Sequence, residues 1–303
     1  QVKAWGWNTI RPNINCAPTG SPSVAETLAG LDQLINEYTA KKLVVMITCR
    51  VTVGTDYSYS SAQVQASLPF IKTVAQKYKD NPYVWMNTFN EPIVNQSAWT
   101  ALNQSLYNDV RAVAPDMLFV ADLAGMGNQI ESIADANLAT SFGAGKCNVL
   151  YDWHAYGFIN GQWATDAEHQ TYISRVASKN IAMVIGEFGD PLKDGGAPLT
   201  LQDPTVPGVA GNPDQNRIGA NAVISYARPA GYGLIWWIAT GDSNAGIVYS
   251  LTKDKTSPWT VTAANASTKL SATGKRFWDS SHQNHNLGKF TGSLAASGCA
   301  SAQ

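Results

Sequence analysis

Residues 83–92 read YVWMNTFNEP, a stretch that passes from a nearly continuous apolar run into an amide, a carboxylate and a proline. Short apolar runs rich in β-branched and aromatic residues are typical of strands buried on both faces. Six further runs of this kind occur at residues 6–14, 43–49, 117–122, 148–154, 182–188 and 233–239. The sequence therefore predicts seven buried strands.

Segments with the helical spacing of apolar residues separate these runs. They occupy residues 23–42, 61–80 and 97–116, where apolar side chains recur every three or four positions. Repeated strand–helix units predict parallel strands joined by right-handed crossovers, in a closed barrel or a doubly wound sheet. No Gly-x-Gly-x-x-Gly follows a strand, which disfavours a nucleotide-binding doubly wound sheet. We therefore predict an α/β fold, a (β/α)8 TIM barrel whose first βα unit is not identifiable in this sequence.

The chain shows no internal repeat and no linker, so residues 1–303 are predicted to form one domain. The Pro-, Gly- and Asp-rich residues 190–213 are predicted to form a long loop, and the tail from about residue 280 is predicted to be irregular. The long loop directly follows a predicted strand. In a barrel it would stand over the C-terminal mouth, where active sites lie.

The composition is that of a weakly charged globular protein, with 45% hydrophobic and 14% charged residues and a net charge of -1. Such a balance gives no reason to expect a nucleic-acid partner, and no apolar run reaches the about 18 residues of a membrane span. The chain opens at Gln1 without methionine, which fits either a mature, processed protein or a trimmed chain. An even cysteine count without C-x-x-C spacing predicts one or two disulfides in an unresolved pairing of Cys16, Cys49, Cys147 and Cys299.

Two glutamates hold equivalent positions in the predicted barrel. Glu91 follows the strand at 83–89, and Glu187 ends the strand at 182–188. Alone, Glu91 could be a helix-starting acid and Glu187 a buried acid paired with an arginine. Together at one rim, about 5 to 5.5 Å apart, two carboxylates meet the requirement for retaining glycoside hydrolysis.

The motifs FNEP (89–92), WHAY (153–156) and IGEFG (185–189), with the Trp-rich last strand, resemble glycoside hydrolase family 5 of the retaining (β/α)8 clan. Within that family, residues 6–14, 116–133 and 231–242 look most like bacterial endo-β-1,4-mannanases. The resemblance runs from about residue 3 to about residue 255. It starts at the end of the family's first helix, which accounts for the strand missing from the predicted set.

The resemblance implies that Glu91 is the acid/base and Glu187 the nucleophile. Asn90 would bind the substrate 2-hydroxyl, in a bond that strengthens toward the transition state. Glu91, in the more apolar surroundings, would enter the reaction protonated.

Four further substrate-binding residues are implied by the same motifs. Arg11 would pair with Glu187 and hold it ionised, Tyr156 would donate a hydrogen bond to it, and His154 would line the subsite before the cleaved bond. Strand alternation turns one of two adjacent tryptophans outward, and similarity to the family favours Trp237 as the sugar platform. Each residue also has a purely structural alternative. His154 and Tyr156 could be core polar groups with satisfied hydrogen bonds, Arg11 could form a structural ion pair, and Trp237 could be a packed core ring.

The sequence departs from the family in two places. The family carries a histidine after its third strand, whereas residues 46–56, MITCRVTVGTD, have none and place Arg50 nearby. The segment 190–213 is also longer than the mannanase pattern. Both differences bear on the subsites and leave mannan and glucan open as substrates.

We therefore expect a secreted, extracellular, monomeric retaining endo-β-glycosidase that acts on β-1,4-linked plant polysaccharide, with mannan as the favoured substrate. No metal or cofactor, and no nucleic-acid or membrane partner, is implied. An endo-β-1,4-glucanase of the same family is the nearest alternative, and a non-catalytic carbohydrate-binding barrel is an alternative of another class. Further tryptophans that could line outer subsites are Trp5, Trp99, Trp153 and Trp163.

Overall fold

The computed structural model describes residues 7–51, 58–135, 142–143, 145–156, 158–159, 162–163, 166–188, 220–237 and 264–269. The chain divides into two compact units. The N-terminal unit comprises Asn8–Trp153, Ile181–Met183 and Thr291–Gln303, and the C-terminal unit comprises Gln1–Trp7, His154–Asn180 and Val184–Phe290.

The N-terminal unit is built on parallel strands that follow one another in chain order. They are β1 (Thr9–Ile10), β2 (Asn13–Asn15), β3 (Val44–Arg50), β4 (Val84–Asn87), β5 (Leu118–Asp122) and β6 (Val149–His154). Both β1 and β2 pair with β3, and the order continues through β4 and β5 to β6. The register sets Asp122, the last residue of β5, opposite Asp152 of β6, so two carboxylates lie side by side on neighbouring strands.

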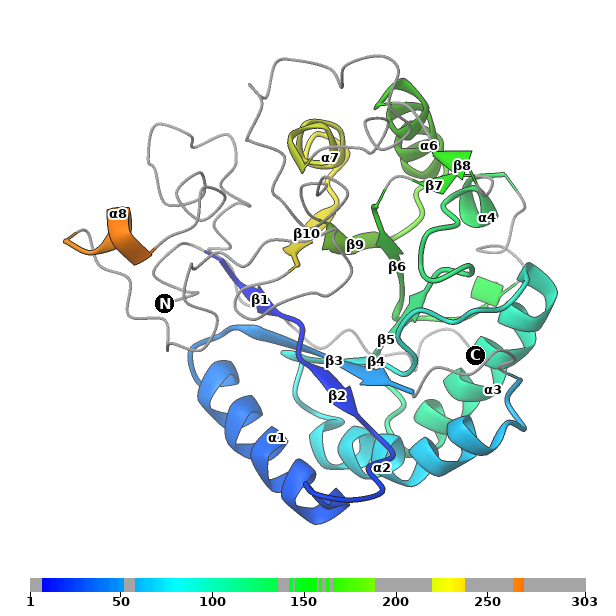
Figure 1. Ribbon diagram of the computed structural model, residues 1–303. Coiled ribbons are helices and arrows are strands. Elements are labelled where there is room, and N and C mark those ends of the chain that lie inside the picture. The colour runs from blue at the N-terminus through cyan, green and yellow to red at the C-terminus, as the bar shows by residue number, and fades with distance from the viewer. Residues whose placement is uncertain are drawn as a thin grey trace. The chain divides into compact units, whose positions relative to one another are not determined.

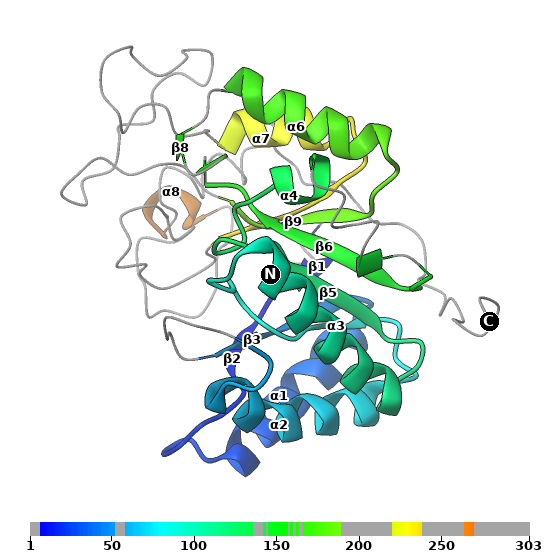
Figure 2. The ribbon, with the colours of Figure 1, turned by 90° about the vertical axis from the view of Figure 1, so that its right-hand side faces the viewer.

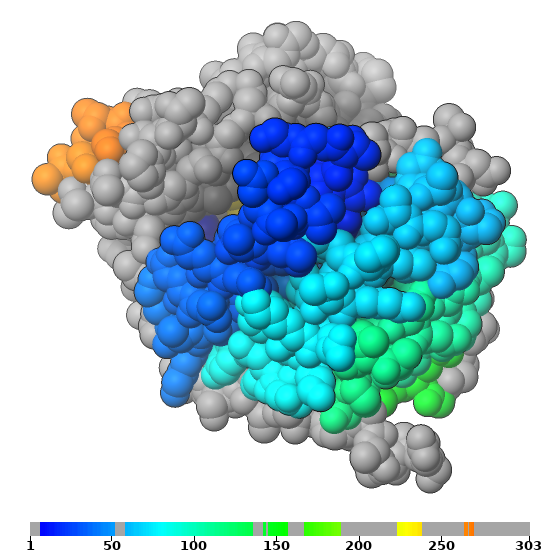
Figure 3. All heavy atoms as spheres, turned by 90° about the horizontal axis from the view of Figure 1, so that it is seen from below, coloured from blue at the N-terminus to red at the C-terminus, as the bar shows by residue number. Residues whose placement is uncertain are grey.

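Helices connect these strands. They are α1 (Val24–Thr39), α2 (Ala62–Tyr78), α3 (Gln96–Val113) and the short α4 (Glu131–Ala134). Figures 1 and 2 show α1, α2 and α3 along the outer side of β3, β4 and β5, and Figure 3 shows this face from below, coloured from blue to green. A capping box of Ser23 and Glu26 starts α1, and the Asn95 side chain caps α3. Every residue of β3 except Arg50 is buried, as a strand covered on both faces requires.

A disulfide between Cys16 and Cys49 joins the chain just after β2 to the end of β3. Cys147 is disulfide-bonded as well. Among the described residues, none of the helices has the length and hydropathy needed to cross a membrane.

The C-terminal unit contains a small antiparallel pair, β7 (Phe158–Ile159) and β8 (Gln162–Trp163), followed by α6 (Asp166–Ser178). Next come β9 (Met183–Phe188), α7 (Ala220–Ala227), β10 (Gly233–Trp236) and α8 (Ala266–Lys269). Strand β10 runs parallel to β9, and helices α6 and α7 pack side by side (Figure 2). The Ala155 N–H donates to the Glu187 carbonyl at 2.8 Å, so the chain after β6 also pairs with β9.

All seven predicted strands are present, and the sheet order β1-β3-β4-β5-β6-β9-β10 follows the sequence. The run at residues 6–14 is split into β1 and β2 at Arg11 and Pro12, because proline has no N–H to donate to a ladder. The predicted loop at 190–213 and the predicted irregular tail lie outside the described residues. The single-domain organisation stays a prediction.

Candidate active site

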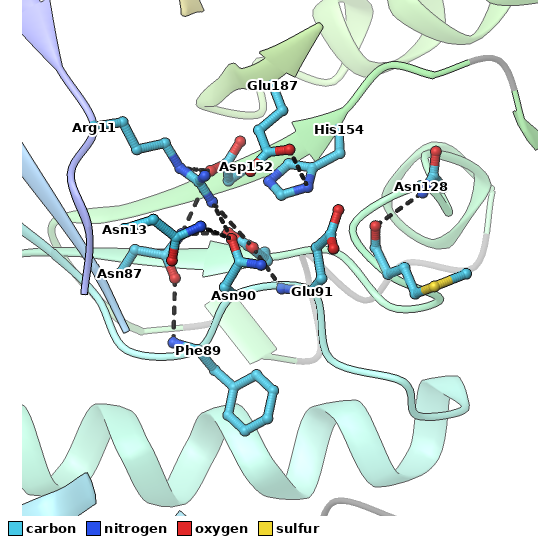
Figure 4. Close-up of polar contacts among 12 residues, drawn as sticks. Arg11, Asn13, Asn87, Phe89, Asn90, Glu91, Asn128, Asp152, His154 and Glu187 are labelled. Atoms are coloured by element: carbon cyan, nitrogen blue, oxygen red, sulfur yellow. Dashed lines mark hydrogen bonds and ion pairs between the residues drawn. The ribbon is translucent and has the colours of Figure 1, made fainter. Parts of the chain in front are cut away.

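The turn after β4 carries Asn90 and Glu91, and its backbone is fixed at three successive N–H groups. The Phe89 N–H donates to the Asn87 side chain at 3.2 Å, the Asn90 N–H to the Cys49 carbonyl at 2.8 Å, and the Glu91 N–H to Asp122 Oδ2 at 2.8 Å. Figure 4 shows this turn below Arg11. The two motif residues are thus held by groups from β3, β4 and β5.

Glu91 adopts a left-handed backbone conformation, with φ at 52°. For a residue other than glycine, this conformation costs about 1–2 kcal/mol of free energy, and such strain is common at functional sites. The hydrogen bond from the Glu91 N–H to Asp122 offsets part of that cost. The strained turn places a half-buried carboxylate directly after a strand end.

The Asn90 side chain is oriented by two donors. Its Oδ1 accepts from Arg11 Nη2 at 3.0 Å and from Asn13 Nδ2 at 3.4 Å. Because a guanidinium can only donate, the Asn90 oxygen must face Arg11. The amide hydrogens on Nδ2 are then the groups that Asn90 has left to offer a ligand.

Arg11 lies between two buried aspartates that sequence reasoning did not assign to the site. Its Nη2 is 3.4 Å from Asp122 Oδ2, and its Nε is 3.4 Å from Asp152 Oδ2. The exposed fraction of the side chain is 1% for Arg11 and 0% for both aspartates. The only sequence signal for these aspartates was their place in two apolar runs, with Asp122 at the end of one and Asp152 inside the other. The predicted pairing of Arg11 with Glu187 stays a prediction.

In the C-terminal unit, Glu187 lies on β9, and two side chains from the end of β6 and just beyond it approach its carboxylate. Tyr156 Oη donates to Glu187 Oε2 at 2.8 Å, the bond that the family resemblance implied. His154 Nδ1 is 3.7 Å from the same oxygen (Figure 4). Glu187 is 5% exposed and His154 is fully buried. Both groups approach the same carboxylate oxygen, Oε2 of Glu187.

The two adjacent tryptophans at the end of β10 differ in burial, as strand alternation predicts. Trp236 is buried, with its ring packed edge-on against Phe188 at 5.3 Å between centroids. Trp237 is half-buried, and its backbone N–H donates to the Phe188 backbone carbonyl at 3.1 Å. The more accessible ring is therefore the one that the sequence assigned to substrate.

Trp99 and Trp153 do not line an outer subsite, which corrects a sequence-based expectation. Both are completely buried, and their indole N–H groups donate to the backbone carbonyls of Asp122 and Asn128. A fully buried ring that has its polar partner inside the protein is part of the core. Trp5 and the side chain of Trp163 lie outside the described residues.

A family model described as "Cellulase (glycosyl hydrolase family 5)" matches residues 1–243. The chain belongs to glycoside hydrolase family 5. It is therefore a glycoside hydrolase by family, and the predicted (β/α)8 fold class is confirmed by this match together with the parallel strand order.

Curated family 5 relatives include two proteins of low sequence identity. The mannan endo-1,4-beta-mannosidase of Streptomyces lividans is 24% identical over 253 residues, which are 82% of this chain and 58% of that protein. The beta-mannanase/endoglucanase A of Caldicellulosiruptor saccharolyticus is 23% identical over 247 residues, 80% of this chain and 16% of that protein. The chain thus spans less than two thirds of either relative.

Solved structures of two family 5 enzymes share the fold. The beta-mannanase from Streptomyces thermolilacinus has a TM-score of 0.65 and 20% identity, with 97% of this chain and 86% of that chain covered. The catalytic domain of Thermobifida fusca endoglucanase Cel5A has a TM-score of 0.63 and 17% identity, with 91% and 82% covered. At these identities the structural likeness establishes the family 5 fold alone.

Proposed function

We propose that the protein is a retaining endo-β-1,4-glycosidase that cleaves mannan by double displacement, with Glu187 as nucleophile and Glu91 as acid/base. The observation that carries this proposal is the placement of each glutamate. Glu91 lies in the turn after β4, and its backbone N–H donates to Asp122. Glu187 lies near the end of β9, and its carboxylate accepts from Tyr156. Carboxyl ends of parallel barrel strands are where such enzymes carry catalytic residues.

In the first step, a Glu187 oxygen attacks the anomeric carbon while Glu91 gives its proton to the departing glycosidic oxygen. The C–O bond to the leaving sugar breaks, and a covalent glycosyl ester of Glu187 forms. In the second step, Glu91 takes a proton from water, the resulting hydroxide displaces Glu187, and the sugar is released with its β configuration retained. Tyr156 donates a hydrogen bond to Oε2 of the nucleophile and so helps to orient the carboxylate for attack.

Asn90 would act in both steps through its amide hydrogens. Because its oxygen is turned toward Arg11 and Asn13, the Nδ2 group is the donor for the sugar 2-hydroxyl. That hydrogen bond gains strength as positive charge develops on the sugar ring. The buried Arg11 therefore contributes to catalysis by fixing an amide orientation.

Mannan is the proposed substrate because mannan-degrading enzymes recur among the relatives in sequence and structure. A β-1,4-glucan is the second candidate, since an endoglucanase shares the fold and the matching family model is described as a cellulase. The two polymers differ in the C2 hydroxyl, axial or equatorial, which is the group assigned to Asn90. Discrimination would therefore arise close to the catalytic centre.

We also propose that the enzyme is secreted and acts as a monomer. The Cys16–Cys49 disulfide supports secretion, since disulfides persist mainly in oxidising compartments. A polysaccharide too large to enter a cell is a suitable substrate for an extracellular enzyme. Gel filtration coupled to light scattering would test the monomer, with the mass of 32.5 kDa as the expected result.

The decisive experiment is reducing-end release from galactomannan, glucomannan, carboxymethyl cellulose and β-1,3-glucan in parallel, with Glu187→Ala as the blank. Activity on the two mannans alone supports the mannanase assignment, and activity centred on carboxymethyl cellulose replaces it with the glucanase. Polysaccharide binding without any release would favour the carbohydrate-binding barrel. NMR of the first-formed sugar adds the stereochemical test, because an α product contradicts double displacement.

A further inference from the structure

Asp122, the last residue of β5, contacts four residues of the N-terminal unit. Its Oδ2 accepts from the Glu91 N–H at 2.8 Å and lies 3.4 Å from Arg11 Nη2, and its Oδ1 accepts from the Asn87 side chain. Its backbone carbonyl accepts from Trp99 Nε1 at 2.7 Å. The carboxylate is inaccessible to solvent, so it cannot contact substrate and can act only through the residues that it holds.

The bond to the Glu91 N–H matters because of the conformation of that residue. At φ 52°, the Glu91 peptide is held in a region that side-chain-bearing residues rarely populate. An ionised acceptor makes a hydrogen bond roughly twice as strong as a neutral one, and this bond is also shielded from water. Asp122 is therefore suited to hold the turn in a conformation that it would otherwise leave.

We propose that Asp122 is a positioning residue for general acid/base catalysis, which aims the Glu91 side chain by fixing the Glu91 backbone in its left-handed conformation. The inference rests on the proposed function, because it takes Glu91 as the acid. Loss of the Asp122 carboxylate lets the peptide relax and moves the Glu91 carboxyl away from the glycosidic oxygen. The reaction then loses protonation of the leaving group, while Glu187 retains its own partner, Tyr156.

A competing explanation is that Asp122 serves only to neutralise Arg11. Asp152 separates the two explanations, because it is equally buried and lies at the same 3.4 Å from the guanidinium. The Glu91 N–H, however, is donated to Asp122. A loss of charge beside Arg11 is common to Asp122→Asn and Asp152→Asn, whereas replacement of the charged acceptor of the Glu91 N–H by a weaker, neutral one is specific to Asp122→Asn.

The experiment measures kcat/KM of wild type, Asp122→Asn, Asp152→Asn and Glu91→Ala on aryl β-mannobiosides, from 2,4-dinitrophenyl to phenyl. Aryl β-cellobiosides replace them if the polysaccharide panel identifies a glucanase. General acid catalysis contributes about 10²- to 10⁴-fold for poor leaving groups and little for good ones. We expect Asp122→Asn to lose about a hundredfold with phenyl and less than tenfold with dinitrophenyl, and Asp152→Asn to lose equally with both.

Two outcomes overturn the inference while the proposed function stands. In the first, the loss of kcat/KM depends steeply on the leaving group in Glu91→Ala but not in Asp122→Asn. In the second, it depends as steeply on the leaving group in Asp152→Asn as in Asp122→Asn. A flat dependence in Glu91→Ala itself removes the acid role of Glu91, and this inference falls with it. If Asp122→Asn does not fold, Asp122→Glu keeps the charge near Arg11 but displaces the carboxylate, and the same leaving-group dependence is expected of it.

Discussion

Tyr156 gives the clearest single-residue test of the proposed nucleophile. Its hydroxyl donates to Glu187 Oε2 at 2.8 Å, a bond between a neutral donor and a charged acceptor. Such bonds contribute about 1.5–3 kcal/mol, so Tyr156→Phe should lower kcat about ten- to hundredfold. KM for the polysaccharide should change little, because the phenol acts on Glu187.

Tyr59→Phe is a matched control for this change. Tyr59 also donates its hydroxyl to a carboxylate, that of Asp109 on α3, at 2.5 Å. Its removal should leave kcat unaltered. Steady-state kinetics of the two variants would contradict the role of Tyr156 if their kcat values fell equally or not at all.

Asn90 offers a second residue-scale prediction, in which substrate and enzyme are changed together. Asn90→Asp keeps an oxygen toward Arg11 but loses the amide donor. We expect a loss of about a hundredfold in kcat/KM on an aryl glycoside that carries the 2-hydroxyl. On the 2-deoxy analogue, wild type and variant should differ by less than about threefold, since the hydrogen bond is absent in both cases. Equal losses on the two substrates would remove Asn90 from contact with the 2-hydroxyl.

The residues that sequence could place are those that belong to strand-end motifs, such as Asn90 with Glu91 and His154 with Tyr156. Asp122 and Asp152 were missed as members of the site for a physical reason. Each is a single acid in an apolar run, a pattern that does not say which residue it will pair with. Only the parallel register, which sets Asp122 opposite Asp152, brings both to Arg11. The partners of a buried cation depend on tertiary pairing, which local sequence does not contain.

At the scale of elements, the strands were predictable because each is a short, nearly continuous apolar run between amphipathic segments. The interruption between β1 and β2 was not predicted, because residues 6–14 were interpreted as one strand despite Pro12, which has no N–H to donate to a ladder. The pair β7 and β8 was not predicted either, because strands of two residues are too short to produce a periodic signal. Short elements are set by their neighbours more than by their own sequence.

Arg111 carries the element-scale prediction, because it ties the end of α3 to the chain before β5 and β6. Its guanidinium donates to the carbonyls of Met117 at 2.7 Å, Cys147 at 3.0 Å and Asn148 at 3.2 Å. It also stacks over the Tyr107 ring at 4.5 Å from the centroid. Lysine cannot reproduce this fork of donors, so Arg111→Lys should lower the free energy of unfolding by about 1.5–3 kcal/mol.

Urea denaturation would measure this change, with Lys41→Ala as the control. Lys41 pairs with Glu37 one turn away on α1, and both side chains are more than half exposed. Its removal should leave the unfolding midpoint unchanged. An Arg111→Lys midpoint equal to that of wild type would mean that the carbonyl contacts contribute nothing to stability.

At the scale of the whole molecule, the Cys16–Cys49 disulfide is the strongest constraint on the unfolded chain that the described residues show. It closes a segment with a sequence separation of 33 residues, which contains α1 and most of β3. In the chain-entropy account, a loop of this length stabilises the folded state by about 4 kcal/mol. Because the Asn90 N–H donates to the Cys49 carbonyl, the cross-link also lies next to the turn that carries Glu91.

We therefore expect the double variant Cys16→Ala/Cys49→Ala to melt at a temperature lower by about 8–16 °C, since each kcal/mol corresponds to about 2–4 °C in a domain of 150–250 residues. Thermal unfolding followed by circular dichroism, with and without reductant, would measure the change. Reductant should lower the melting temperature of wild type by at least as much, because Cys147 is also disulfide-bonded. In the double variant, reductant should lower the melting temperature further only by the contribution of the disulfide that Cys147 makes. A double variant that melts with wild type would show that packing around β2 and β3 alone holds this segment, and that the disulfide adds nothing to the stability of the folded enzyme.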